Sequence, residues 1–311
     1  MKLLFSHSRS SLFFSLKLIS LKKNEIILIP DYNCSSFMTP IRKLSINYKT
    51  YSVNSKLIIN IKELKKKISK NVRAIVIVNY FGVPSQISKI SKLCKKKKII
   101  LINDNAHGAS GIYNKKKLIN YGDIGFESYH KIFNKIQNLS ILSINNKSLQ
   151  ERIKSLKINQ TFKTNYSSRL LFLAKIKIKN ILFKKIRINK TNKKNKNDNL
   201  FYNIPVSNFD INLYNKINFQ NEKKARHKNI NSIMKIADRF NVTPLYKNLN
   251  QSLMLWYFPI IKLNYKFLNY LKIKKIPYVN WPSFPKELNS KKNNIIKKKI
   301  VCLPLDYNYY E

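Results

Sequence analysis

Glycine is scarce in this chain of 311 residues: only five are present, and all of them lie between positions 82 and 125. A residue this scarce is expected to persist where the backbone needs a left-handed or crowded conformation that no side chain allows. Cysteine is scarce too, with three residues and no CxxC pair, which argues against a disulfide framework and against a zinc site. We therefore expect the functional chemistry in the segment 74–144.

Long apolar runs are absent as well. No run reaches the roughly 18 residues that a membrane helix needs. Residues 2–21 resemble a signal peptide only faintly, because polar residues at 7–11 interrupt the apolar centre. These features predict a soluble, cytoplasmic protein that does not span a membrane.

Acidic residues are few, 14 against 61 Lys and Arg, so the formal net charge is +47. Such a charge is compatible with binding to nucleic acid or another polyanion. However, only eight of the basic residues are Arg, whose planar fork phosphate-binding proteins favour. Lys, Asn and Ile share A/T-rich codons, so base-composition drift is the favoured explanation, and nucleic acid is not the favoured partner.

Continuous apolar segments alternate with helical patterns. Strands are expected at 25–30, 74–78, 99–102, 124–129 and 139–144, with a helix at 85–97. This pattern predicts an α/β fold with a mostly parallel sheet covered by helices on both faces. We expect a large domain at 1–160, a basic and partly irregular insertion or linker at 161–220, and a small α/β domain at 221–311.

Several chemically active side chains are predicted to meet at the carboxyl edge of that sheet. Asp104 follows one buried strand, and Ser128 and Lys131 follow another. Ser8, Arg9 and Ser10 precede or open a helix, whose N-terminus favours an anion. A phosphate site, a carboxylate and an amine together suit pyridoxal phosphate, because the carboxylate keeps the ring nitrogen protonated and the lysine holds the aldehyde as an imine.

The order and spacing of several motifs resemble the DegT/DnrJ/StrS-type sugar aminotransferases of fold type I. The matching segments are His7-Ser8-Arg9-Ser10-Ser11-Leu12, Ile27 to Cys34, Tyr80-Phe81-Gly82-Val83-Pro84, Ile102 to His107, Tyr121-Gly122-Asp123-Ile124, Ser128-Tyr129-His130-Lys131, and near the end Trp256 to Pro259, Trp281-Pro282 and Cys302 to Leu305. The resemblance implies a large sheet of the seven-stranded type and a small C-terminal domain.

The resemblance also implies roles. Lys131 would bind the cofactor covalently and move a proton, and Asp104 would pair with the pyridine nitrogen. His107 would lie against the ring, with Cys34 beside it, and the phosphate would be held by Ser128, Ser8, Arg9 and Ser10. The implied substrate is a nucleotide-linked keto-sugar for O-antigen or capsule synthesis, with glutamate as the expected amino donor. Family members form homodimers.

Some positions depart from the family pattern. Relatives with this Ser–Lys spacing carry Gly-Gly at the positions of Asn138 and Leu139, and Ser8 replaces a glycine. They also continue into a final helix beyond the position of Glu311. A second hypothesis is therefore a catalytically degraded homologue that acts as a binding or partner subunit. A third is a polyanion-binding protein that uses the basic run at 184–197.

Each candidate residue also has a purely structural interpretation. Asp104 could cap a strand–helix turn, and His107 could be a hydrogen-bonded core residue. Ser8 and Ser10 could cap the first helix. Lys131 could be one surface lysine among many, while Trp256 and Trp281 are expected in the core rather than beside a substrate.

Overall fold

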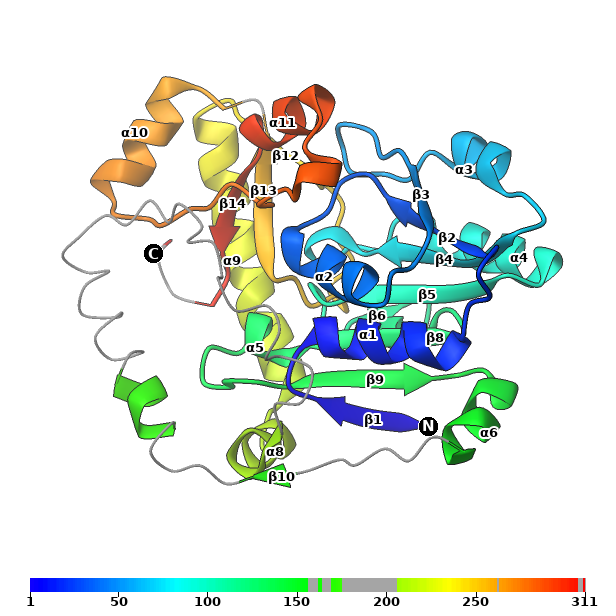
Figure 1. Cartoon of the computed structure of the whole chain (residues 1–311). Coiled ribbons are helices and arrows are strands. Elements are labelled where there is room, and N and C mark those ends of the chain that lie inside the picture. The colour runs from blue at the N-terminus through cyan, green and yellow to red at the C-terminus, as the bar shows by residue number, and fades with distance from the viewer. Residues whose placement is uncertain (156–161, 164–168, 175–205, 262, 307–309, 311) are drawn as a thin grey trace.

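A sheet of seven strands forms the centre of the molecule (Figure 1). The computed structural model describes residues 1–155, 162–163, 169–174, 206–261, 263–306 and 310. The strand order is β1-β9-β8-β5-β4-β2-β3. The strands are β1 (Lys2–Phe5), β2 (Ile26–Pro30), β3 (Tyr48–Tyr51), β4 (Val72–Val78), β5 (Ile100–Asn105), β8 (Ile124–Ser128) and β9 (Ser140–Ile144).

The predicted α/β class with a mostly parallel sheet is confirmed. β3, β2, β4, β5 and β8 pair in parallel, whereas β9 runs antiparallel to both of its neighbours, β8 and β1. Every residue of β2, β5, β8 and β9 is buried, as expected for continuous apolar strands. The edge strands β1 and β3 escaped the sequence analysis because they are short and partly exposed.

Helices pack against this sheet and carry part of the site. The helix α1 (Ser8–Ile19) contacts β8, β9 and the helix α2 (Ser35–Lys43) (Figure 1). It buries Leu12, Leu16 and Ile19. The other helices of the N-terminal half are α2 (Ser35–Lys43), α3 (Ile61–Lys67), α4 (Ile87–Lys97), α5 (Tyr129–Ile132) and α6 (Lys147–Ser155). α1 and α2 both follow a strand or turn that leads to the same edge of the sheet.

A smaller antiparallel sheet lies beside the central one, with the order β12-β13-β14 (Figure 1). Hydrogen bonds connect the segment just before β13 to the loops that follow the large sheet's strands. The Trp256 backbone N–H donates to the Phe81 carbonyl at 3.2 Å and to the His107 carbonyl at 3.0 Å. The C-terminal elements are α9 (Phe219–Arg239), β12 (Thr243–Pro244), β13 (Tyr257–Ile261), α10 (Tyr265–Ile273), α11 (Lys291–Lys298) and β14 (Val301–Pro304). The C-terminal segment thus meets the carboxyl ends of the parallel strands.

The proposed insertion at 161–220 is described only in part. Its basic run at 184–197 lies outside the described residues, whereas Val206–Ser207 forms β11 and Asn208–Asn215 forms the helix α8. Within the described part of the chain, no helix is both long and apolar enough to cross a membrane.

Candidate active site

One pocket collects six of the eight residues singled out in the sequence. Its polar lining contains Lys131, Asp104, His107, Ser8, Arg9 and Cys34. They come from α5, the end of β5, the turn after it, the start of α1 and the turn after β2. Segments that are far apart in the sequence therefore converge at the carboxyl edge of the parallel strands, as expected for an open α/β sheet.

Asp104 reaches the pocket from a central strand. It is only 8% exposed and sits in β5, paired with Val78 on one side and Phe126 on the other. Its Oδ1 accepts a hydrogen bond of 2.9 Å from the Ala106 backbone N–H, so it does stabilise the local turn. Burial raises the pKa of Asp104 to about 6, although the Ala106 hydrogen bond and the nearby Lys131 charge oppose this shift. A cation in the pocket would relieve that burial cost.

Lys131 is the amine of the pocket. Burial lowers its pKa, the neighbouring Cys34 and Asp104 act against that shift, and Arg9 adds to it. Its Nζ lies 4.8 Å from the centre of the Trp256 ring. Lys135, the alternative lysine nearby, is exposed and does not line the pocket. The geometry therefore favours Lys131 as the reactive amine.

His107 is buried beneath an aromatic cluster. Its Nδ1 accepts a hydrogen bond of 3.2 Å from the Phe81 backbone N–H, which leaves the proton of the neutral ring on Nε2. Burial holds its pKa well below the usual range. The ring centre lies 4.6 Å from that of Trp256 and 4.8 Å from that of Trp281. The two tryptophans thus pack against a residue that lines the pocket.

Steric crowding explains why glycine is required at positions near the pocket. A Cβ on Gly82 would lie 2.6 Å from the His107 carbonyl oxygen, and the Gly82 φ of +94° is itself unfavourable for other residues. A Cβ on Gly125, in β8, would lie 1.9 Å from the Ile119 carbonyl oxygen. The expectation that the glycines mark crowded backbone is confirmed for four of the five, the exception being Gly111, and Gly82 lets its loop approach His107 closely.

The first turn of α1 supplies donors to the pocket. α1 begins at Ser8, and no acidic residue lies in its first turn, so its N-terminus presents positive potential to the pocket. Arg9 adds a positive side chain to the same lining. This arrangement can hold a phosphate or another anion.

Ser10 and Ser128 are buried, but neither belongs to the pocket lining. Ser128 Oγ lies 3.2 Å from His130 Nδ1, and the His130 ring lies 5.3 Å from that of His7. Burial lowers the pKa of His130 to about 3 and that of His7 to about 2. The two imidazoles are therefore neutral near Arg9 and Lys131. A role of Ser10 and Ser128 in phosphate binding stays a prediction.

Sequence reasoning missed two buried polar residues of this region. Asn33 lines the pocket next to Cys34, inside a motif that had been recognised for its other residues. Glu127 precedes Ser128 in β8 and is 2% exposed. A carboxylate in an otherwise apolar strand was the available signal for Glu127, and for Asn33 the signal was its place beside Cys34.

Glu127 is held by three hydrogen bonds from described residues. Its Oε1 accepts from Asn105 Nδ2 at 3.0 Å, and its Oε2 accepts from the Ser110 backbone N–H at 3.1 Å and from the Tyr129 hydroxyl at 2.9 Å. Burial raises its pKa, and these hydrogen bonds counteract the rise. Glu127 thereby ties the end of β8 to the loop that follows β5, the loop that carries His107.

No group of three or more His, Cys, Asp or Glu side chains in the described ranges could hold a metal ion. The polar groups of the pocket instead combine a half-buried amine, a carboxylate, a neutral imidazole and a helix N-terminus. Such a set can bind an anionic molecule that carries a carbonyl group.

The comparisons with known proteins agree with this picture. The profile of the DegT/DnrJ/EryC1/StrS aminotransferase family matches residues 5–181. GDP-4-keto-6-deoxy-D-mannose 3-dehydratase of Escherichia coli O55:H7 is 29% identical over 123 residues, 39% of this chain and 31% of that protein. UDP-4-amino-4,6-dideoxy-N-acetyl-beta-L-altrosamine transaminase of Helicobacter pylori is 31% identical over 115 residues, 36% of this chain and 30% of that protein. The matched segment spans about a third of the length of each curated relative.

Solved structures share the fold over nearly the whole chain. Helicobacter pylori PseC, an aminotransferase involved in the biosynthesis of pseudoaminic acid, superposes with a TM-score of 0.64 at 16% identity, covering 97% of this chain and 81% of that one. An aminotransferase of the same family from Brucella abortus gives 0.66 at 13% identity, with coverages of 98% and 80%. An E. coli GDP-4-keto-6-deoxy-D-mannose-3-dehydratase with bound hydrated PLP gives 0.65 at 14%, with coverages of 99% and 84%.

Proposed function

Because the chain belongs to the DegT/DnrJ/EryC1/StrS aminotransferase family, we propose that it is a pyridoxal-phosphate-dependent aminotransferase acting on a nucleotide-linked keto-sugar. One observation carries the proposal: the amine of Lys131 and the carboxylate of Asp104 share a pocket with the N-terminus of α1. Amine, carboxylate and phosphate site are the three features this cofactor needs.

The pocket passes a test of fit. Arg9 and the first turn of α1 would hold the phosphate, Asp104 would face the ring nitrogen, and Lys131 would bind the aldehyde. The buried Nδ2 of Asn33 has no partner among the described residues and is therefore open to a ligand oxygen. When bound, pyridoxal phosphate supplies an aldehyde that condenses with amines and a protonated ring that withdraws electrons.

The residues of the pocket have distinct tasks in this proposal. Burial lowers the pKa of Lys131, so more of its amine is neutral, able to act as a nucleophile and to accept a proton. Asp104 would stay ionised opposite a protonated nitrogen, since a nearby cation lowers a carboxyl pKa. His107 keeps its proton on Nε2 and can donate one hydrogen bond.

The substrate class is proposed from the relatives. The two curated proteins named above are, by their names, a dehydratase of a GDP-linked keto-deoxysugar and a transaminase of a UDP-linked aminosugar. A nucleotide-linked keto-sugar is the substrate class compatible with both, and surface polysaccharide synthesis, with glutamate as amino donor in the cytoplasm, is the context we propose.

A catalytically degraded homologue is the second candidate, because Asn138 and Leu139 replace a glycine pair. The local structure tolerates that replacement. Neither residue has a positive φ, and Asp210 accepts hydrogen bonds of 2.9 Å from both the Gln137 and Asn138 backbone N–H groups. The turn is thus formed without glycine, and an active enzyme is the better proposal.

Reductive trapping tests the proposed function. Pyridoxal phosphate added to the purified protein should give an absorption band that shifts with an amino donor, and borohydride should fix the cofactor on Lys131. Peptide mapping would identify the labelled lysine, and Lys135→Ala is the matched control that should still be labelled. A Lys131→Ala variant should fold but show neither the shift nor the label. Labelling on Lys135, or on no lysine, would contradict the proposal.

We also propose a homodimer, the commonest closed assembly. Two chains of +47 repel each other, but salt screens that repulsion over about 8 Å at physiological ionic strength. Association is therefore expected to strengthen as salt is raised, and sedimentation velocity at several salt concentrations measures it. A monomer at every salt concentration would contradict the dimer and favour the degraded homologue.

A further inference from the structure

The turn after β2 carries a buried donor that the rest of the described protein leaves unsatisfied. Asn33 is 2% exposed and lines the pocket, and its Nδ2 has no hydrogen-bond partner among the described residues. Proteins pair nearly all buried polar groups, so an exception needs an explanation. Inside a pocket, the simplest explanation is an acceptor atom on a ligand.

The orientation of the Asn33 amide is fixed by its neighbour. Its Oδ1 accepts a hydrogen bond of 2.8 Å from the Cys34 backbone N–H. A backbone N–H can only donate, so a flipped amide would set two donors against each other. The oxygen therefore stays with Cys34, and the NH₂ group remains available to the pocket.

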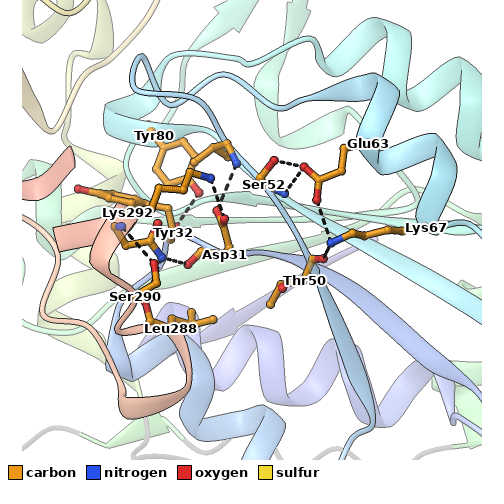
Figure 2. A network of polar contacts seen from close by, with 12 residues as sticks. Asp31, Tyr32, Thr50, Ser52, Glu63, Lys67, Tyr80, Leu288, Ser290 and Lys292 are labelled. Atoms are coloured by element: carbon orange, nitrogen blue, oxygen red, sulfur yellow. Dashed lines mark hydrogen bonds and ion pairs between the residues drawn. The ribbon is translucent and has the colours of Figure 1, made fainter. Parts of the chain in front are cut away.

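The backbone before Asn33 is anchored as well (Figure 2). The Asp31 carboxylate accepts from the Val53 backbone N–H at 3.2 Å and lies 3.0 Å from Lys292 Nζ, while Asn293 Nδ2 donates to the Asp31 carbonyl at 2.7 Å. These contacts hold the turn from both the segment that follows β3 and α11. The turn cannot move as a unit without breaking them.

Tyr32 adds two buried anchors. Its hydroxyl donates to the Trp281 carbonyl at 2.9 Å. Its own carbonyl accepts from the Tyr80 hydroxyl at 2.6 Å (Figure 2). These bonds fix the backbone that carries Asn33, and rotation of its side chain toward an internal acceptor would break the hydrogen bond from Cys34 to Oδ1.

The surroundings determine what kind of acceptor fits. Arg9 and Lys131 line the same pocket, and the N-termini of α1 and of the nine-residue α2 border it. Positively charged side chains and the positive ends of helix dipoles favour an anionic oxygen. Resting on the proposed function, we infer that Asn33 is a further cofactor-binding residue that donates a hydrogen bond from Nδ2 to an anionic oxygen of pyridoxal phosphate, on its phosphate or its ring.

Cofactor titration of two variants tests this inference. Asn33→Asp keeps an oxygen for the Cys34 N–H but removes the donor, and Asn33→Leu removes the donor without adding charge. Each should raise the dissociation constant of pyridoxal phosphate by about tenfold or more, as for a lost hydrogen bond to a charged group. Absorbance and quenching of tryptophan fluorescence, with Trp256 beside Lys131, report binding without turnover.

Asn229→Asp is the matched control. Asn229 is also buried, and its Nδ2 donates to the Leu305 carbonyl at 3.1 Å, but it does not line the pocket. This variant should lower thermal stability and leave the cofactor dissociation constant within about twofold of that of the unaltered protein, since its change is remote from the ligand. If Asn33→Leu does not fold, Asn33→Asp decides the test.

Titration with pyridoxal, which lacks the phosphate, identifies the acceptor. A loss that persists with pyridoxal assigns the ring oxygen, and a loss seen only with pyridoxal phosphate assigns the phosphate. Unchanged cofactor binding by the folded Asn33 variants overturns the inference, even if the affinity for the amino donor changes. If the unaltered protein itself gives no borohydride-stable adduct, the proposed function fails and this inference fails with it.

Discussion

Two buried carboxylates on adjacent strands of the same sheet have opposite surroundings. Glu127 in β8 accepts three hydrogen bonds, from Asn105, Ser110 and Tyr129. Asp104 in β5 accepts a single one from the described residues, the Ala106 backbone N–H, and lines the pocket with Lys131. Burial raises the pKa of both carboxyls, so burial alone does not separate them.

The difference lies in how completely each carboxylate is satisfied. A fully bonded buried carboxylate stabilises its own fold, whereas one with free acceptor capacity in a pocket is suited to a ligand. Glu127 is therefore assigned a positioning role, because it fixes the loop that carries His107. Asp104 is assigned a binding role, and the following predictions test that division.

The largest expected effect is on turnover by Asp104→Asn. The neutral amide cannot hold a protonated ring nitrogen, so the half-reaction should slow on the order of 10²–10³-fold, the range for losing one preorganised electrostatic partner. Cofactor should still bind through the other groups of the pocket. Stopped-flow absorbance after addition of an amino donor measures the rate, and unchanged turnover would reduce Asp104 to a cap of its turn.

Glu127→Gln should act mainly on stability. The glutamine amide can place its NH₂ group at either of the two oxygen positions of the carboxylate. In both orientations this NH₂ group faces at least one group that now donates a hydrogen bond to Glu127. One unsatisfied buried donor costs about 1–3 kcal/mol, so the free energy of unfolding should fall by that amount. Urea denaturation of the cofactor-free protein measures it, with Asp104→Asn as the comparison that should fall less at pH 7. Equal losses would erase the distinction between the two carboxylates.

The sequence supported most of the site because its chemistry lies in local motifs. Asp104, His107 and Lys131 follow apolar strands, and parallel strands end at one edge, so their meeting point could be inferred. Ser8 and Arg9 could be placed because a helix pattern follows them. These inferences needed only periodicity and motif order.

Other features depend on contacts that no local pattern encodes. Asn33 matters because of a missing partner, and Glu127 because of three partners from distant positions. Trp256 was expected in the core, yet its ring lies against both Lys131 and His107, more than 120 residues away in sequence for each. The edge strands β1 and β3 depend on pairing with neighbours rather than on their own composition.

The last expected effect is a pH dependence of stability, which Asp104→Asn isolates from the contribution of Glu127, whose pKa is also raised. Its pKa rises on folding from 3.8 to about 6, so the folded state binds more protons between these values. Stability from this group is present below about pH 4 and is lost as the pH rises to 6, by about 2–3 kcal/mol in total at 1.36 kcal/mol per pKa unit. Asp104→Asn removes that loss. The unfolding free energy of the variant minus that of the unaltered protein should therefore increase by this amount across the window.

A second variant sharpens the assignment. The positive charge of Lys131 holds the Asp104 pKa below the value that burial alone would give. In a Lys131→Met background the Asp104 pKa should therefore be higher, and the window in which Asp104→Asn gains stability should extend to higher pH. Urea titrations of the four cofactor-free proteins at intervals from pH 4 to 8 provide the comparison. A window that does not move would show that the two side chains do not interact, and the pocket would then lack the coupled amine and carboxylate on which the proposed chemistry depends.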